Sequence, residues 1–190
     1  MASLKAFLPE IAKAFGTTAD ALYGRQRALV RIGLLPVTKG KGPGSGVALT
    51  ADTFGVMLIS LLAAETLAET DERVARLCEA APDKLEWDDT QQNFVDAKTF
   101  RAAVSEVTRR GLNVRGYFVK SLRVSRSRGQ LVIVEGTAEK RRMLTKTYVA
   151  STTHQPGLFS PIVRTNEVEL GGRLEMHELF NKFAIAAKNP

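Results

Sequence analysis

The sequence has few of the residues that form disulfides, metal sites and reactive nucleophiles. Its 190 residues include one cysteine, Cys78, and two histidines, His154 and His177. A single thiol excludes an intrachain disulfide and fits the reducing cytoplasm. The acidic pair Asp88 and Asp89 has no further ligand at metal-binding spacing, so we expect neither a metal nor a cofactor. Cys78 lies on an apolar helix face, which favours a core residue over a nucleophile.

Long hydrophobic runs are also absent. The longest, residues 54–64, is shorter than the ~20 residues that span a bilayer. Residues 1–16 place charged side chains inside their apolar pattern, unlike a secretory signal peptide. Apolar residues make up 44% of the chain and charged residues 25%, which are the proportions of a globular protein. We therefore expect a soluble cytoplasmic protein without a membrane partner.

Acidic residues are scarce where basic residues gather. Residues 108–146 contain 11 Lys or Arg and two Asp or Glu. Residues 61–107 contain five Lys or Arg and 11 Asp or Glu. The whole chain has a net charge of +7. A basic protein whose charge is gathered in blocks favours an anionic partner. Nucleic acid is the first candidate for that partner. A solvated basic surface without a partner is the alternative.

The start of the chain predicts two helices joined by a short turn. Apolar side chains recur at helical spacing over 3–14, where Pro9 is expected to kink the helix or shift its start. Thr18 can cap a second helix over 18–32, because its hydroxyl satisfies a free backbone N–H. Gly33 is expected to end that helix. Two helices around a short turn that contains glycine form a helix-turn-helix.

The second helix has an inner and an outer side. At 100° per residue, Leu22, Leu29 and Arg25 fall on or near one side, which we expect to be buried. The outer side carries aromatic and basic side chains. Its members are Asp20, Tyr23, Gly24, Arg27 and Arg31. In a helix-turn-helix the second helix enters the major groove, so this outer side is the candidate DNA contact.

A glycine-rich stretch, TKGKGPGSG at 38–46, follows this helix. It does not fit a phosphate-binding loop. Gly42 stands where G-x-x-x-x-G-K-[ST] requires a hydroxyl, and Ser45 stands where G-x-G-x-x-G requires glycine. We expect no nucleotide-binding enzyme, and a hairpin tip is favoured over a flexible linker because extended segments flank the glycines. Lys39 and Lys41 can pair with phosphates, and Ser45 can donate a hydrogen bond.

The order of these features resembles a known DNA-binding family. The stretch RIGLLPVTKGKGPGSGVALTADTF, 31–54, is similar to the MerR-like and excisionase winged-helix family, in which a G-L-L-x-P turn leads into a glycine-containing wing and a polar helix cap. Over residues 3–68 the resemblance implies a winged helix-turn-helix that binds double-stranded DNA and regulates transcription. The excisionase likeness also implies a prophage or mobile-element origin. The expected DNA contacts in this region are Thr18, Tyr23, Arg27, Arg31, Lys39, Lys41 and Ser45.

Two further helical segments complete the first half of the chain. Residues 51–68 are apolar nearly all round, so we expect a helix that is buried on several sides. Residues 69–81 continue as an acidic helix with a narrow apolar seam, which favours a homodimer. The polar, acidic stretch 82–93 then predicts a linker between a winged-helix domain over 1–81 and an oligomerisation or partner domain over 94–190.

The second half predicts a small α+β unit with an antiparallel sheet. The expected elements are a helix over 94–111, a hairpin over 113–136 that turns at 125–130, strands over 143–150 and 162–170, and a closing helix over 172–188. Along the first hairpin strand, alternation places Phe118, Leu122 and Val124 on one face and Val119 on the other. The predicted fold class is therefore α+β for both parts of the chain.

The basic hairpin 113–136 leaves alternatives to a purely N-terminal DNA site. Arg126 and Arg128 in its turn can add phosphate contacts. The hairpin can instead contact an acidic protein partner, which would make the chain an assembly or adaptor protein. A third possibility is an RNA-binding module centred on 113–150, with aromatic side chains stacked on bases. No small-molecule substrate is indicated.

Overall fold

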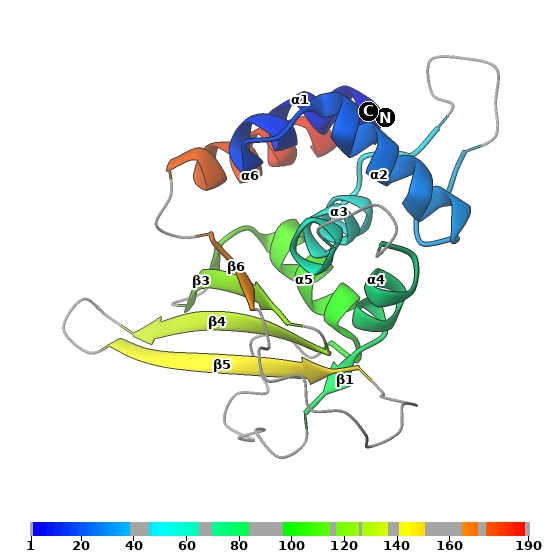
Figure 1. The fold of residues 1–190 in the computed structure, drawn as a ribbon. Coiled ribbons are helices and arrows are strands. Elements are labelled where there is room, and N and C mark those ends of the chain that lie inside the picture. Colours follow the sequence, from blue (N-terminus) through cyan, green and yellow to red (C-terminus); the bar gives the residue numbers. More distant parts are fainter. Residues whose placement is uncertain are drawn as a thin grey trace, which may run out of the picture.

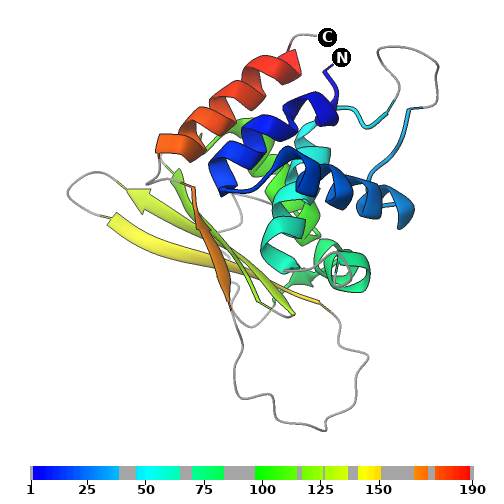
Figure 2. The same ribbon diagram turned by 45° about the horizontal axis from the view of Figure 1, so that its top comes forward.

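The computed structural model describes residues 2–38, 46–64, 70–83, 97–114, 117–125, 127–136, 141–150, 165–170 and 174–188. The helices are α1 (Leu4–Phe15), α2 (Ala19–Arg31), α3 (Ala51–Ala63), α4 (Thr70–Cys78), α5 (Phe100–Arg110) and α6 (Leu174–Lys188). The strands are β1 (Ala81–Pro82), β2 (Asn113–Val114), β3 (Tyr117–Val124), β4 (Arg128–Gly136), β5 (Arg141–Val149) and β6 (Asn166–Glu169). The helices lie on one face of the sheet (Figures 1 and 2), with α1, α2 and α6 farthest from it.

The sheet is antiparallel, with the order β1-β5-β4-β3-β2 and with β6 also paired to β3. This confirms the predicted α+β class. The alternation predicted along β3 is wrong before its middle, because Val119 is fully buried and Phe118 only partly so. A bulge between Val119 and Ser121 causes this change. An extra residue in a strand moves the side chains on one side of it to the opposite face.

The inner face of the sheet meets α5 at a glycine. The ring of Phe100, the first residue of α5, lies directly over Gly129 of β4. It also contacts Tyr148 of β5, with ring centroids 5.6 Å apart. Gly129 and Tyr148 are register partners in the sheet, and Phe100 and Tyr148 are both fully buried. The glycine therefore makes room for an aromatic ring that joins the helices to the sheet.

The first helix runs through its proline. Ser3 caps α1 by accepting the Ala6 N–H at 3.2 Å, and Gly16 ends it with a φ of 63°. The prediction that Pro9 shifts the helix start is wrong, because Pro9 lies inside α1. Pro9 removes the N–H that would bond to the Lys5 carbonyl, and both residues lie on the exposed side. Solvent can satisfy that carbonyl, so the helix continues.

The third helix is the centre of the core, as its apolar sequence predicts. Phe54 is fully buried and contacts Phe7 of α1 and Phe180 and Phe183 of α6, with ring centroids 5.9, 5.6 and 4.9 Å away. Gly55 allows the close approach of α5, since a Cβ there would lie 3.4 Å from the Ser105 backbone nitrogen. Neither α3 nor any other helix in the described ranges is long and apolar enough to cross a membrane.

The apolar seam predicted over 69–81 is buried within the chain itself. Val74, Leu77 and Cys78 of α4 belong to the hydrophobic core and are fully buried. Ala81 is exposed and belongs to β1 instead of the helix. Because its own core covers the seam, the predicted homodimer would need another surface.

The predicted linker, 82–93, falls mostly outside the described residues. On its two sides the described residues share one hydrophobic core, which includes side chains of α1 to α6 and of the sheet. Arg101 of α5 donates to both carboxylate oxygens of Asp52 in α3, at 2.7 and 2.5 Å. The Phe100 N–H donates to the Ala80 carbonyl at 2.9 Å. The described parts of the two predicted domains are thus packed together.

Candidate nucleic-acid interface

The inner side of α2 is fixed to the rest of the protein by apolar packing and one arginine. Leu22 and Leu29 are fully buried, as predicted. Arg25 donates to the carbonyls of Ser60 and Ala64, at 2.7 and 3.0 Å, where α3 ends. Burial lowers the pKa of Arg25 from its usual value, although a guanidinium stays protonated in proteins. A cation is favourable at a helix C-terminus, so Arg25 sets the position of α2 against α3.

The outer side of α2 presents the predicted stripe. Tyr23, Arg27 and Arg31 follow one another at i, i+4 and i+8, so they lie along one side of the helix. All three are exposed. The stripe extends about 12 Å along the helix axis, at 1.5 Å per residue. Helix α2 itself belongs to the layer of helices farthest from the sheet (Figure 1).

Thr18 caps α2. Its hydroxyl oxygen accepts the Ala21 N–H at 3.2 Å, and its backbone is extended, as expected for a helix cap. Gly33, which was predicted to end this helix, has a φ of 78° directly after the cap residue Ile32. The capping role of Thr18 is confirmed, and its DNA contact stays a prediction.

The glycine-rich stretch is closed by a backbone pair at its base. The Thr38 N–H donates to the Gly46 carbonyl at 2.9 Å, and the Gly46 N–H donates back to the Thr38 carbonyl at 3.2 Å. The residues after Gly46 pair with the start of the chain, since the Leu4 N–H donates to the Val47 carbonyl at 2.8 Å. The predicted contacts Lys39, Lys41 and Ser45 lie outside the described residues. Thr38 and Gly46, which flank these three residues, are paired with each other beside the start of α1.

The second basic block is partly neutralised within the chain. Arg109 donates to both carboxylate oxygens of Glu106, at 3.0 and 2.8 Å, and Arg110 pairs with the same carboxylate. The hydrogen bond from Arg109 is the main reason why the pKa of Glu106 lies below its usual value. Arg128 is exposed at the start of β4, and Arg126 lies outside the described residues. Glu106 thus holds two of the arginines of this block.

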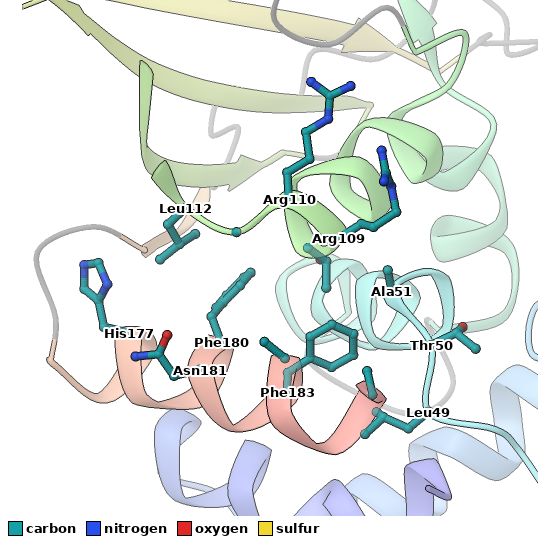
Figure 3. A pocket seen from close by; sticks show the side chains of 14 residues that line it. Leu49, Thr50, Ala51, Arg109, Arg110, Leu112, His177, Phe180, Asn181 and Phe183 are labelled. Atoms are coloured by element: carbon teal, nitrogen blue, oxygen red, sulfur yellow. The ribbon is translucent and has the colours of Figure 1, made fainter. Parts of the chain in front are cut away.

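A cavity of about 730 Å³ lies between α6, the start of α3 and the end of α5 (Figure 3). Its walls include Leu112, Phe180 and Phe183, and Figure 3 shows the guanidinium groups of Arg109 and Arg110 turned away from α6. The volume suits a small molecule. The cavity shares no residue with the stripe on α2, so it is not part of the candidate interface.

The lone cysteine has the surroundings of a core residue. Burial raises the pKa of the Cys78 thiol to about 12. We expect the native protein to resist a disulfide reagent such as Ellman's at pH 8 and the urea-unfolded protein to react fully. The unfolded thiol ionises near 9.0, so the stability due to this shift is present below pH 9 and is lost as the pH rises toward 12. Rapid native labelling at pH 8 would contradict the assignment.

Metal ligation has no support among the residues described. Within those ranges, no three His, Cys, Asp or Glu side chains are grouped to hold an ion. His177 stacks on the ring of Phe118 with centroids 6.1 Å apart, which gives it a packing contact. Sequence reasoning missed one residue beside the stripe on α2, Lys5, whose ammonium lies 4.6 Å from the centre of the Tyr23 ring. Lys5 lies on α1, and no local pattern links it to α2.

Comparisons with protein-family models, curated proteins and solved structures found no match to this chain. The resemblance to MerR-like and excisionase proteins therefore stays a prediction. A function for the chain has to be inferred from the geometry and charge of α2 and its neighbours.

Proposed function

We propose that this chain is a sequence-specific double-stranded DNA-binding protein that regulates transcription. In this proposal α2 enters the major groove and residues 38–46 act as a wing on the phosphate backbone. One observation carries the proposal. The inner side of α2 is anchored by Leu22, Leu29 and Arg25, while Tyr23, Arg27 and Arg31 form an exposed stripe on its outer side.

Each part of this surface suits a different contact with duplex DNA. The planar guanidinium groups of Arg27 and Arg31 can bind two acceptors of guanine at once or a phosphate, whereas lysines act as compact point charges. In a docked helix-turn-helix the second helix reads base edges while the first crosses the backbone. Lys39 and Lys41, between the paired residues Thr38 and Gly46, are then suited to the phosphates beside the groove.

The decisive test measures binding of the whole chain to duplex DNA. We expect salt-sensitive binding to mixed-sequence duplex in fluorescence anisotropy, and enrichment of a preferred site from a randomised duplex pool. Arg27→Ala with Arg31→Ala should weaken binding to that site by about tenfold or more, because each specific contact contributes about 1–3 kcal/mol. The same variant should lose the sequence preference and keep its melting temperature, since both side chains are exposed.

A matched variant removes two positive charges elsewhere on the helices. Lys13→Ala with Arg76→Ala takes one charge from the last turn of α1 and one from α4, both exposed or partly exposed. It should weaken binding much less than the Arg27 and Arg31 pair. Equal losses in the two variants, or no duplex binding at low salt, would argue against the proposal. Binding to RNA alone would favour the module centred on 113–150.

A further inference from the structure

A lysine of the first helix lies against the aromatic end of the stripe on α2. The Lys5 ammonium sits 4.6 Å from the centre of the Tyr23 ring. An ammonium over the face of an aromatic ring is attracted by the ring's electron distribution. Lys5 itself is exposed. The positive stripe therefore begins on α1 and continues along α2 through Arg27 and Arg31.

The ring holds this charge without neutralising it. Arg109 shows the other arrangement, since Glu106 engages its guanidinium with two hydrogen bonds. A tyrosine ring carries no formal charge, so the full positive charge of Lys5 stays available to an anion. The contact restricts the side chain while its charge remains, and restricting a flexible side chain before binding reduces the entropy lost on binding.

The backbone around Lys5 is well fixed. Leu4, its neighbour, is fully buried and donates its N–H to the Val47 carbonyl at 2.8 Å. Lys5 also stands in the first turn of α1, which contains no acidic residue. Positive charge is unfavourable at that end of a helix, because the helix dipole is positive there. A nearby anion would relieve this conflict, and a local rule broken at an exposed position marks a functional candidate.

We infer that Lys5 is a contact to the DNA phosphate backbone, held over Tyr23 at the edge of the groove that α2 enters. This inference rests on the proposed function. The first helix of a docked helix-turn-helix crosses the backbone, which is where an ammonium from α1 would meet a phosphate. Lys5 adds to affinity and fixes the orientation of α2, and it does not read sequence.

The test compares two lysines of the same helix. Lys5→Met should weaken binding of the whole chain to duplex at all sequences alike. The slope of log affinity against log salt should become shallower by about 0.9, the value for one lost phosphate contact. Lys13→Met, at the exposed far end of α1, should leave the slope unchanged.

Conservative variants separate the charge of Lys5 from the contact with the ring. Lys5→Arg keeps the positive charge and should keep the slope. Tyr23→Phe retains the ring face, so it should keep more affinity than Tyr23→Leu.

A second measurement uses the unmodified protein and needs no variant to fold. Acetylation of each lysine by a soluble acetylating reagent is followed by mass spectrometry with and without duplex. Duplex should slow acetylation of Lys5 several-fold and leave Lys13 nearly unchanged. If duplex binds and Arg27→Ala with Arg31→Ala weakens it, but Lys5 and Lys13 behave alike, the inference about Lys5 is wrong and the proposed function stands. If the wild-type chain binds no duplex, both are wrong.

Discussion

Gly129→Ala should lower the free energy of unfolding by about 3 kcal/mol, at the upper end of the usual range for overpacked cores. A Cβ on Gly129 would lie 2.5 Å from three ring atoms of Phe100. The ring cannot easily move aside, because it is fully buried and packed against Tyr148. Denaturant unfolding followed by circular dichroism measures this loss.

A double-mutant cycle separates this clash from a general preference for glycine in β4. Phe100→Leu shortens the side chain that meets Gly129 and should itself destabilise the core. In that background Gly129→Ala should cost much less than in the wild type, since residues in contact are not additive. Equal effects of Gly129→Ala in both backgrounds would show that the Phe100 ring is not the obstacle.

Phe54→Ala should have the largest effect of any substitution considered, about 4 kcal/mol, within the 3–5 kcal/mol typical of buried Phe→Ala changes. Phe54 is fully buried and contacts Phe7 of α1 together with Phe180 and Phe183 of α6. The change removes buried apolar surface and leaves a cavity where three helices meet. Thermal and denaturant unfolding measure the loss, and hydrogen exchange should show α6 to be among the elements most affected.

Two further variants show whether position matters in this prediction. Phe54→Leu keeps much of the volume and should cost clearly less than Phe54→Ala. Phe15→Ala removes the same side chain at a partly buried position at the end of α1, so it should also cost less. A loss at Phe54 no greater than that at Phe15 would mean that the phenylalanine cluster is not a central part of the core.

Local patterns were sufficient to predict most of the secondary structure. Thr18 caps its helix because a hydroxyl before an apolar repeat satisfies a free N–H. The hairpin of β3 and β4 follows from two β-rich segments around a short turn. The inner position of Arg25 on α2 was also predictable from its angle on the helix, although its partners on α3 were not.

Contacts between distant residues lay beyond these patterns. Nothing in the periodicity around Phe100 indicates that its ring needs a glycine opposite it in β4. The pairing of Lys5 with Tyr23 depends on how two helices pack, which helical spacing does not determine. The bulge after Val119 also could not be predicted from the alternation. One extra residue in the strand exchanges the faces on which the side chains before it lie.

The position of Phe54 also bears on how the chain folds during synthesis. Two of its three aromatic neighbours, Phe180 and Phe183, belong to α6 and are more than 100 residues later in the chain. Contacts so distant in sequence form late, because a long loop must close before they bring any stabilisation. The core beneath α1 and α3 is therefore completed only once α6 has left the ribosome. Chains interrupted before that point would lack two of the three aromatic rings that pack on Phe54, and the exposed core would make them substrates for chaperones and proteases.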